Sequence, residues 1–346
     1  MLKQVRPVPS PDAVALTPTQ ARILSALSLN ARAPYSEIAE QLGVSRQAVK
    51  YNHDLLLSRG IIESHYALLN IVKLGLLYHR VFLHVANISP AAERKLIETF
   101  RRHPNVGWVV EQDGPWDLAL AVWTRSMTAF EKVLDDMLFK MGRQVDETRV
   151  SYSARIYHLK HKFLTQETNT EALEVGGEVA QVALDDTDYA VLGVLTQTGR
   201  KSFSEIGAQL AISPKVVEYR SRRMLDLGVI LGFHVKLNHE RLGYTHHKIL
   251  LELSYVSKHK IAQLIRHLKQ LTSTVCITRS IGFSDLEFEL MVRSNNEFNA
   301  VMKDLRYTFP DLIQNYTSFI ILKETYINYL PAKIETFPIH EIYQEK

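Results

Sequence analysis

The chain has 346 residues, of which 46% are hydrophobic and 23% charged, a composition typical of folded globular proteins and unlike that of disordered or collagen-like chains. Its length provides about two domains. The single cysteine, Cys276, excludes an intrachain disulfide and zinc sites built on paired thiolates, and it favours a reducing compartment. The net charge of +4 is too small to indicate a polyanionic partner by itself. Prolines near the N-terminus and the lack of a long uncharged apolar run predict a cytoplasmic protein that spans no membrane.

The sequence is an internal duplication. The segment Ser36-Glu-Ile-Ala-Glu-Gln-Leu-Gly-Val-Ser45 reappears 168 positions later as Ser204-Glu-Ile-Gly-Ala-Gln-Leu-Ala-Ile-Ser213, and the same offset relates matching residues far beyond it without a gap. A repeat of this length determines the whole architecture. The predicted segments are an N-terminal arm at 1–15, a winged helix-turn-helix at 16–66, a ferredoxin-like domain at 67–164, a linker at 165–183, a second winged helix-turn-helix at 184–234, a second ferredoxin-like domain at 235–331 and a C-terminal tail at 332–346.

The first third of each copy is typical of a helix-turn-helix. In the first copy a helix begins at Thr17-Pro18, a second helix ends at Gly43, and a third begins at the N-cap Ser45. The third helix of this motif enters the major groove, where its N-terminal side chains meet base edges and neighbouring cations meet phosphates. The candidate DNA-binding residues are Ser45, Arg46, Gln47, Lys50 and Tyr51 in the first copy, and Ser213, Lys215, Tyr219, Arg220, Arg222 and Arg223 in the second. The alternative is a packing or dimerisation module whose basic face is only solvated.

After Gly75 the hydrophobic period changes from 3.6 to 2. The first copy continues with a strand at Leu77–Val85, a helix from Pro90, two strands around the turn Asp113–Trp116, a helix at Thr128–Met141 and a last strand. The second copy repeats this βαββαβ order, which predicts ferredoxin-like domains. The fold class is therefore α+β, with two tandem units that each join a winged helix-turn-helix to such a domain. Because helices cover one face of each sheet, we expect the apolar other face to be buried in an intrachain pseudo-dimer or a homo-oligomer.

At these motifs the chain resembles the Lrp/AsnC family of bacterial and archaeal transcriptional regulators. The resemblance rests on Ile38-Ala-Glu-Gln-Leu-Gly-Val-Ser45, on Gly114-Pro-Trp-Asp-Leu118 and on their counterparts in the second copy. It implies double-stranded DNA as the partner, dimers built sheet to sheet, and a small effector, often an amino acid, bound near the turn between the middle strands. The candidate effector residues carried over are Gly114, Trp116, Asp117, Gly282 and Asp285. The alternative is that glycine and aspartate only form the turn.

The sequence contains no phosphate-binding loop, dinucleotide fingerprint or nucleophile elbow, so we expect neither an enzyme nor a cofactor. His79 and His247 occupy the same strand position in the two copies. They suit a metal or proton-transfer site, but their strand parity favours histidines satisfied at a sheet or interface edge. His158 and His161 alternate with lysines, which indicates a solvated edge.

Two rival functions stay open. Siroheme decarboxylases are similar in fold and occur as two fused Lrp-like halves, with histidine and arginine near the sheet to bind propionates. Neither middle turn of this chain contains a histidine, and the basic third helices favour DNA. The other rival is an oligomerisation or adaptor module with vestigial winged helices.

Overall fold

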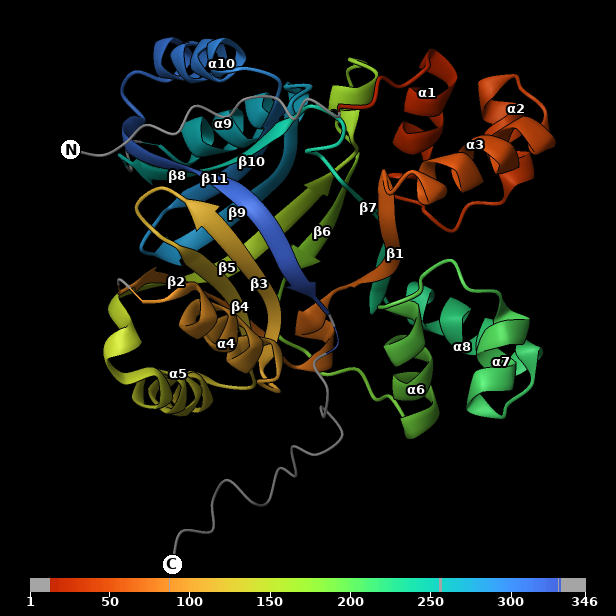
Figure 1. Cartoon of the computed structure of the whole chain (residues 1–346), viewed down its shortest axis with the longest axis horizontal. Coiled ribbons are helices and arrows are strands. Elements are labelled where there is room, and N and C mark those ends of the chain that lie inside the picture. Colours follow the sequence, from red (N-terminus) through yellow and green to blue (C-terminus); the bar gives the residue numbers. More distant parts are fainter. Residues whose placement is uncertain (1–12, 87, 255–256, 329, 331–346) are drawn as a thin grey trace, which may run out of the picture. The chain divides into compact units, whose positions relative to one another are not determined.

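The computed structural model describes residues 13–86, 88–254, 257–328 and 330, and they belong to two compact units (Figure 1). Unit 1 contains the residues up to His65, together with Ile156–Glu174 and Phe233–Ile321; unit 2 contains Tyr66–Arg155, Val175–Gly232 and the chain from Leu322. Each unit therefore combines the winged helix of one sequence copy with most of the ferredoxin-like domain of the other. The predicted tail at 332–346 and most of the predicted arm lie outside the described residues.

Unit 1 contains the first three-helix segment. Its first helix begins with a capping box between Thr17 and Gln20, and its second ends at Gly43, whose φ of +67° is the left-handed conformation that glycine adopts without strain. The buried faces carry apolar side chains such as Ile23, Leu24 and Val49. Its helices are α1 (Pro18–Leu27), α2 (Tyr35–Leu42) and α3 (Arg46–Ser58). Strand β1 (Ile62–Leu69) follows and continues into unit 2, which also contains the 3-10 helix η1 (Ile71–Leu74).

Unit 2 contains the second three-helix segment, which follows the same plan. A capping box between Asp185 and Asp188 begins its first helix. Its second helix ends at Ala211, which takes the place of Gly43 and also has a positive φ, +54°. The elements are α6 (Asp186–Leu195), α7 (Phe203–Leu210) and α8 (Pro214–Asp226), followed by strand β7 (Ile230–Leu237).

The ferredoxin-like domain of unit 2 is an antiparallel sheet in the order β5-β2-β4-β3. Its core joins Val81 and Leu120 of the sheet to Phe100 and Phe130 of two helices. The elements are β2 (Leu77–Val85), α4 (Pro90–Arg101), β3 (Val106–Asp113), β4 (Leu118–Thr124), α5 (Met127–Met141), the 3-10 helix η2 (Gly142–Gln144) and β5 (Val145–Leu159). The predicted βαββαβ order is confirmed.

The ferredoxin-like domain of unit 1 repeats this arrangement with the order β11-β8-β10-β9. Its core joins Ile249 and Phe288 of the sheet to Leu264 and Met302 of two helices, which lie on the same face of the sheet in Figure 1. The elements are β8 (Thr245–Leu253), α9 (Lys258–Gln270), β9 (Thr274–Gly282), β10 (Leu286–Val292), α10 (Asn295–Thr308) and β11 (Ile313–Ile327).

Backbone hydrogen bonds join each winged helix to the rest of its unit. In unit 1, Ala31 N donates to Phe233 O at 2.7 Å and Asn238 N donates to Ile61 O at 2.9 Å. In unit 2, Asn70 N donates to Val229 O at 2.9 Å. The wing strands β1 and β7 therefore hold together residues that are far apart in the sequence.

Two local expectations differ from the structure. The segment at 165–183, expected to be a linker, contains strand β6 (Ala172–Gly176), and the 3-10 helix η3 (Lys162–Leu164) precedes it. The sheet face opposite the helices of unit 1 is not apolar: Lys248 Nζ lies 2.9 Å from Glu287 and 3.0 Å from Glu289, and all three side chains are buried. Buried charges require such partners.

None of the helices formed by the described residues is long and apolar enough to cross a membrane.

Candidate nucleic-acid interface

The third helix of each three-helix segment begins in the same way. Ser45 caps α3 by accepting a hydrogen bond from Ala48 N at 3.1 Å, and Ser213 caps α8 by accepting one from Val216 N at 3.3 Å. Each cap satisfies a backbone N–H at the helix N-terminus and fixes where the helix begins. The two caps therefore position the first turns of α3 and α8, where the candidates Arg46, Gln47 and Lys215 lie.

The candidate side chains of α3 form one exposed face. Arg46, Gln47, Lys50 and Tyr51 are all exposed, and Tyr51 is 67% exposed. Lys50 Nζ lies 2.5 Å from Asp54 one turn later, and this carboxylate raises the pKa of Lys50. Such a surface pair is worth little energy in water, so it leaves the ammonium available to a phosphate.

Helix α8 presents a comparable face with a different charge pattern. Lys215, Tyr219 and Arg222 are exposed, and Tyr219, the counterpart of Tyr51, is 65% exposed. Arg222 lies 2.7 Å from Glu218, again as an exposed pair along the helix. An exposed tyrosine at the same position of both copies is not needed by either core, which is consistent with contact to a partner.

Arg220 and Arg223 differ from the other candidates because they face α6. Arg220 pairs with Asp185 and with Asp188 Oδ1, the latter at 3.0 Å, while Arg223 lies 2.7 Å from Asp188 Oδ2 and donates to Ala183 O. The Asp188 carboxylate is fully buried. These two guanidinium groups therefore hold α8 against the start of α6, a use that their position in a basic run did not reveal.

The candidate effector turns use their aspartates inside the protein. Asp117 Oδ2 accepts from Val85 N at 2.7 Å, and Asp285 Oδ2 accepts from Leu253 N at 2.8 Å, so both copies make the same contact. Gly282 has a φ of +116°, which favours glycine. Gly114 precedes Trp116, whose indole is buried near the ring of Phe82. The two aspartates therefore tie their turns to the end of a neighbouring strand.

The paired strand histidines lie in the two cores. His79 stacks on Phe130 with ring centroids 3.9 Å apart, and its Nε2 is 3.2 Å from Thr124 Oγ1. His247 stacks on Phe298 at 4.4 Å. Burial lowers the pKa of each to about 4, so both imidazoles are neutral near pH 7.

The prediction of a solvated edge at His158 and His161 is wrong. His161 and the neighbouring Lys162 are buried; the His161 ring lies 5.0 Å from His234, and the His158 ring lies 5.9 Å from it. Burial, with the neighbouring His234 as the next cause, lowers the pKa of His161 well below its usual range. We name His158, His161 and His234 the histidine cluster.

The histidine cluster was missed because its members come from the end of β5, from the residue before η3 and from β7, which only the fold brings together. A buried Lys162, whose Nζ donates to Lys269 O at 2.5 Å, shows that the alternation of histidine and lysine does not mark a surface. Among the described residues no group of three or more histidine, cysteine or acidic side chains has the arrangement of a metal site.

Comparison with known proteins supports the helix-turn-helix assignment. A family model described as winged helix-turn-helix DNA-binding matches residues 16–63 and 184–230. The chain is 35% identical over 103 residues to the HTH-type transcriptional regulator Ptr1 of Methanocaldococcus jannaschii, a match covering 30% of this chain and 68% of that protein. It is 30% identical over 123 residues to an uncharacterised HTH-type transcriptional regulator of Pyrococcus furiosus, covering 35% of this chain and 81% of the relative.

Similarity to a solved structure can extend over nearly the whole chain. The crystal structure of the siroheme decarboxylase NirDL superposes with a TM-score of 0.59, covering 92% of this chain and 95% of that one. The sequences are 12% identical, so the likeness is one of fold. The fold of this chain, with its two winged helices and two ferredoxin-like domains, is therefore similar to that of a solved structure along nearly its whole length.

Proposed function

Because this chain belongs to the Lrp/AsnC family of HTH-type transcriptional regulators, in a tandem form, we propose that it is a sequence-specific DNA-binding regulator acting in the cytoplasm. The observation that carries the proposal is the exposed, capped N-terminal face of α3 and of α8. Each face joins hydrogen-bonding side chains, cations and a tyrosine at the position where a winged helix meets DNA. Two such helices on one chain supply the two contacts that a dimer of single-copy regulators would supply.

The two helices have different tasks in this proposal. On α3, Arg46 and Gln47 lie in the first turn, where side chains meet base edges, and Lys50 lies one turn later. On α8, Lys215 in the first turn and Arg222 further along are the exposed cations for phosphates. Arg220 and Arg223 are removed from the set of DNA contacts and assigned to the packing of α8.

The test begins with selection of bound sequences from a random DNA pool, followed by affinity measurements over a range of salt concentrations. Arg222→Ala should weaken binding to all sequences and lower the slope of log affinity against log salt by about one. Gln47→Ala should instead change base preference at one position by roughly 1–3 kcal/mol. Arg220→Ala is the matched control on the same helix, since its ion pairs predict reduced stability and an unchanged salt slope. Failure to enrich any sequence would contradict the proposal.

We further propose that a small effector such as an amino acid modulates DNA binding through the turns at Gly114–Asp117 and Gly282–Asp285. Support comes from the family resemblance and from the buried Trp116, which lies beside Phe82 in the first turn. Amino acids should be titrated while tryptophan fluorescence is followed, with Trp116→Phe as the control that removes this signal. A fluorescence change that survives Trp116→Phe would place the effector elsewhere.

Decarboxylation of siroheme, the reaction in the name of the fold neighbour, is a second candidate. The histidine cluster favours it, because it gathers three imidazoles inside unit 1, and burial lowers the pKa of two of them, His161 and His234. Titration with siroheme, followed by absorbance, separates the two functions. Stoichiometric uptake that His234→Ala abolishes, in a protein that selects no DNA, would support the enzyme; selected DNA sequences without uptake would support the regulator.

A further inference from the structure

A cavity in unit 1 lies between the first helix of the winged helix and the ferredoxin-like domain. Its volume is about 560 Å³, within the range of pockets that hold small ligands. Its apolar lining residues include Leu16, Leu164 and Leu242. Arg22 and Arg293 also line it, and Glu167 is the only acidic residue among the described residues of the lining. The lining is therefore cationic and amphipathic.

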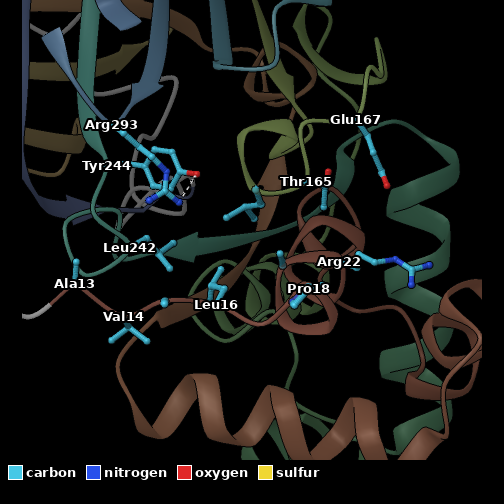
Figure 2. A pocket seen from close by; sticks show the side chains of 13 residues that line it. Ala13, Val14, Leu16, Pro18, Arg22, Thr165, Glu167, Leu242, Tyr244 and Arg293 are labelled. Atoms are coloured by element: carbon cyan, nitrogen blue, oxygen red, sulfur yellow. Dashed lines mark hydrogen bonds between the residues drawn. The ribbon is translucent and has the colours of Figure 1, made fainter. Parts of the chain in front are cut away.

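The guanidinium of Arg293 is held in one orientation and keeps N–H donors for an anion. Its guanidinium lies 4.3 Å from the centre of the Tyr244 ring, and its Nη2 donates to the Tyr244 hydroxyl at 3.0 Å, while that hydroxyl donates to Phe163 O at 3.0 Å. These contacts fix the plane of the guanidinium and use one of its five N–H donors. Neither Arg293 nor Arg22 forms an ion pair within the described part of the chain. Figure 2 shows Arg293 against Tyr244 on one side of the pocket and Arg22 with Glu167 on the other.

A second polar group of the lining lacks a partner. The Thr165 hydroxyl is buried, and among the described residues nothing hydrogen-bonds to it. A buried hydroxyl without a hydrogen-bond partner is unfavourable. A turn of its χ1 angle toward the cavity would let a bound molecule or water satisfy it.

The other sequence copy differs at two positions of this lining. Val14-Ala15-Leu16 recurs 168 positions later as Val182-Ala183-Leu184, but Ala13 corresponds to Gln181 and Ala21 corresponds to Tyr189. In unit 2 the Gln181 side chain accepts a hydrogen bond at 3.1 Å from Arg125, the counterpart of Arg293. Two alanines in unit 1 thus replace two large side chains of unit 2, and Arg293 has no such glutamine to bind.

We propose that this cavity binds a small amphipathic carboxylate, whose anionic group pairs with Arg293 and whose aliphatic chain packs on Leu16, Leu164 and Leu242. A carboxylate matches the forked donors of a guanidinium. The apolar chain supplies binding energy by leaving water. The proposal goes beyond DNA recognition, and its test needs no DNA, so either can fail without the other.

The test is calorimetric titration of the full chain with octanoate, with 1-octanol as the uncharged probe of the same length. We expect one octanoate per chain and at least about tenfold weaker binding of 1-octanol, the difference expected when a charge-assisted hydrogen bond is lost. Arg293→Gln should weaken octanoate binding by a similar factor and leave 1-octanol unaffected. Arg125→Gln, the matched change in unit 2, should leave octanoate binding unchanged.

The filling variant Ala13→Gln with Ala21→Tyr gives unit 1 the side chains that unit 2 carries, and it should abolish binding of both probes. A cooperative thermal unfolding transition shows whether the filling variant folds. If it does not fold, Arg293→Gln, a change at an exposed residue, still tests the proposal. Absence of octanoate binding at millimolar concentration would overturn the proposal. So would binding that persists in the folded filling variant, or equal loss in Arg125→Gln and Arg293→Gln.

Discussion

His247 is a titratable side chain that the fold keeps neutral. Its ring is stacked on Phe298, and its Nε2 has no hydrogen-bond partner among the described residues. Burial, with His246 as a smaller cause, lowers its pKa to about 4, whereas an unfolded histidine titrates near 6.5. Between these two pH values the unfolded chain binds more protons than the folded chain. The contribution of His247 to the free energy of unfolding is therefore fully present above about pH 6.5 and is lost as the pH falls toward 4.

Replacing His247 by Phe should remove this part of the acid sensitivity. We expect the free energy of unfolding to become less dependent on pH, by up to about 1.4 kcal/mol per pH unit between about pH 6 and 4.5. Urea unfolding at a series of pH values measures the slope. His259→Gln is the control, because its imidazole is exposed in the folded chain. An unchanged slope in His247→Phe would show that another group carries the acid sensitivity.

Ala211 ends α7 in a conformation that suits glycine. The corresponding Gly43 has the same left-handed backbone, and a Cβ at Gly43 would meet no atom within 4 Å, so the difference between the copies is one of backbone strain alone. Ala211→Gly should raise the free energy of unfolding by about 0.5–1 kcal/mol, and Gly43→Ala should lower it by a similar amount. Denaturant unfolding of both variants checks this; the same sign for both would contradict it.

At the scale of elements, the two winged helices use different side-chain contacts to hold the first helix against the third. In unit 1 the first and third helices meet through a neutral hydrogen bond of 3.2 Å from Gln20 Nε2 to Asn52 Oδ1. The corresponding positions in unit 2 are Asp188 and Arg220, 3.0 Å apart, with Arg223 added. The sequence predicts that these arginines contact DNA, but a cation on a third helix can either bind a DNA phosphate or form an ion pair that packs the helix. Only the position of Asp188 distinguishes the two roles.

Removing the charge of Asp188 should loosen α6 from α8. Asp188→Asn leaves two arginines facing a neutral amide, and we expect a loss of about 2 kcal/mol in stability, less than for a fully buried pair because both arginines are partly exposed. The double variant Asp188→Gln with Arg220→Asn installs the neutral pair of unit 1 and should recover part of that loss. Denaturant unfolding measures both. A double variant less stable than Asp188→Asn would show that the two packing solutions are not exchangeable.

The elements themselves were predictable from local signals. Ser89, Ser45 and Ser213 cap the helices that the sequence places after them, and the change of hydrophobic period after Gly75 marks the first strand of the sheet. These signals depend on neighbours within a few residues. The histidine cluster and the cavity beside Arg293 depend on contacts between residues more than 70 positions apart, as in the contact between the His161 and His234 rings and in the bond from Tyr244 to Phe163, and no local pattern specifies such contacts.

At the scale of the whole molecule, each compact unit is built from both sequence copies. Neighbouring segments of a chain usually pack together, so the sequence alone suggests that each winged helix folds with the domain that follows it. The structure differs. Val14 N donates to Arg241 O at 2.7 Å within unit 1, and Val182 N donates to Lys73 O at 2.8 Å within unit 2. The duplication makes the exchange possible, because either winged helix meets a domain of the same kind.

Separating the two copies should therefore disrupt both units. We expect residues 1–164 and 165–346, expressed apart, to lack cooperative unfolding as monomers, because each piece carries an incomplete half of unit 1 and of unit 2. Expressed together, the pieces should purify as a complex whose circular dichroism and unfolding transition match those of the intact chain. A monomeric piece with its own cooperative transition would contradict the interleaved arrangement, whereas a piece that folds only as a homodimer would agree with it, since a second copy of the same piece replaces the missing half.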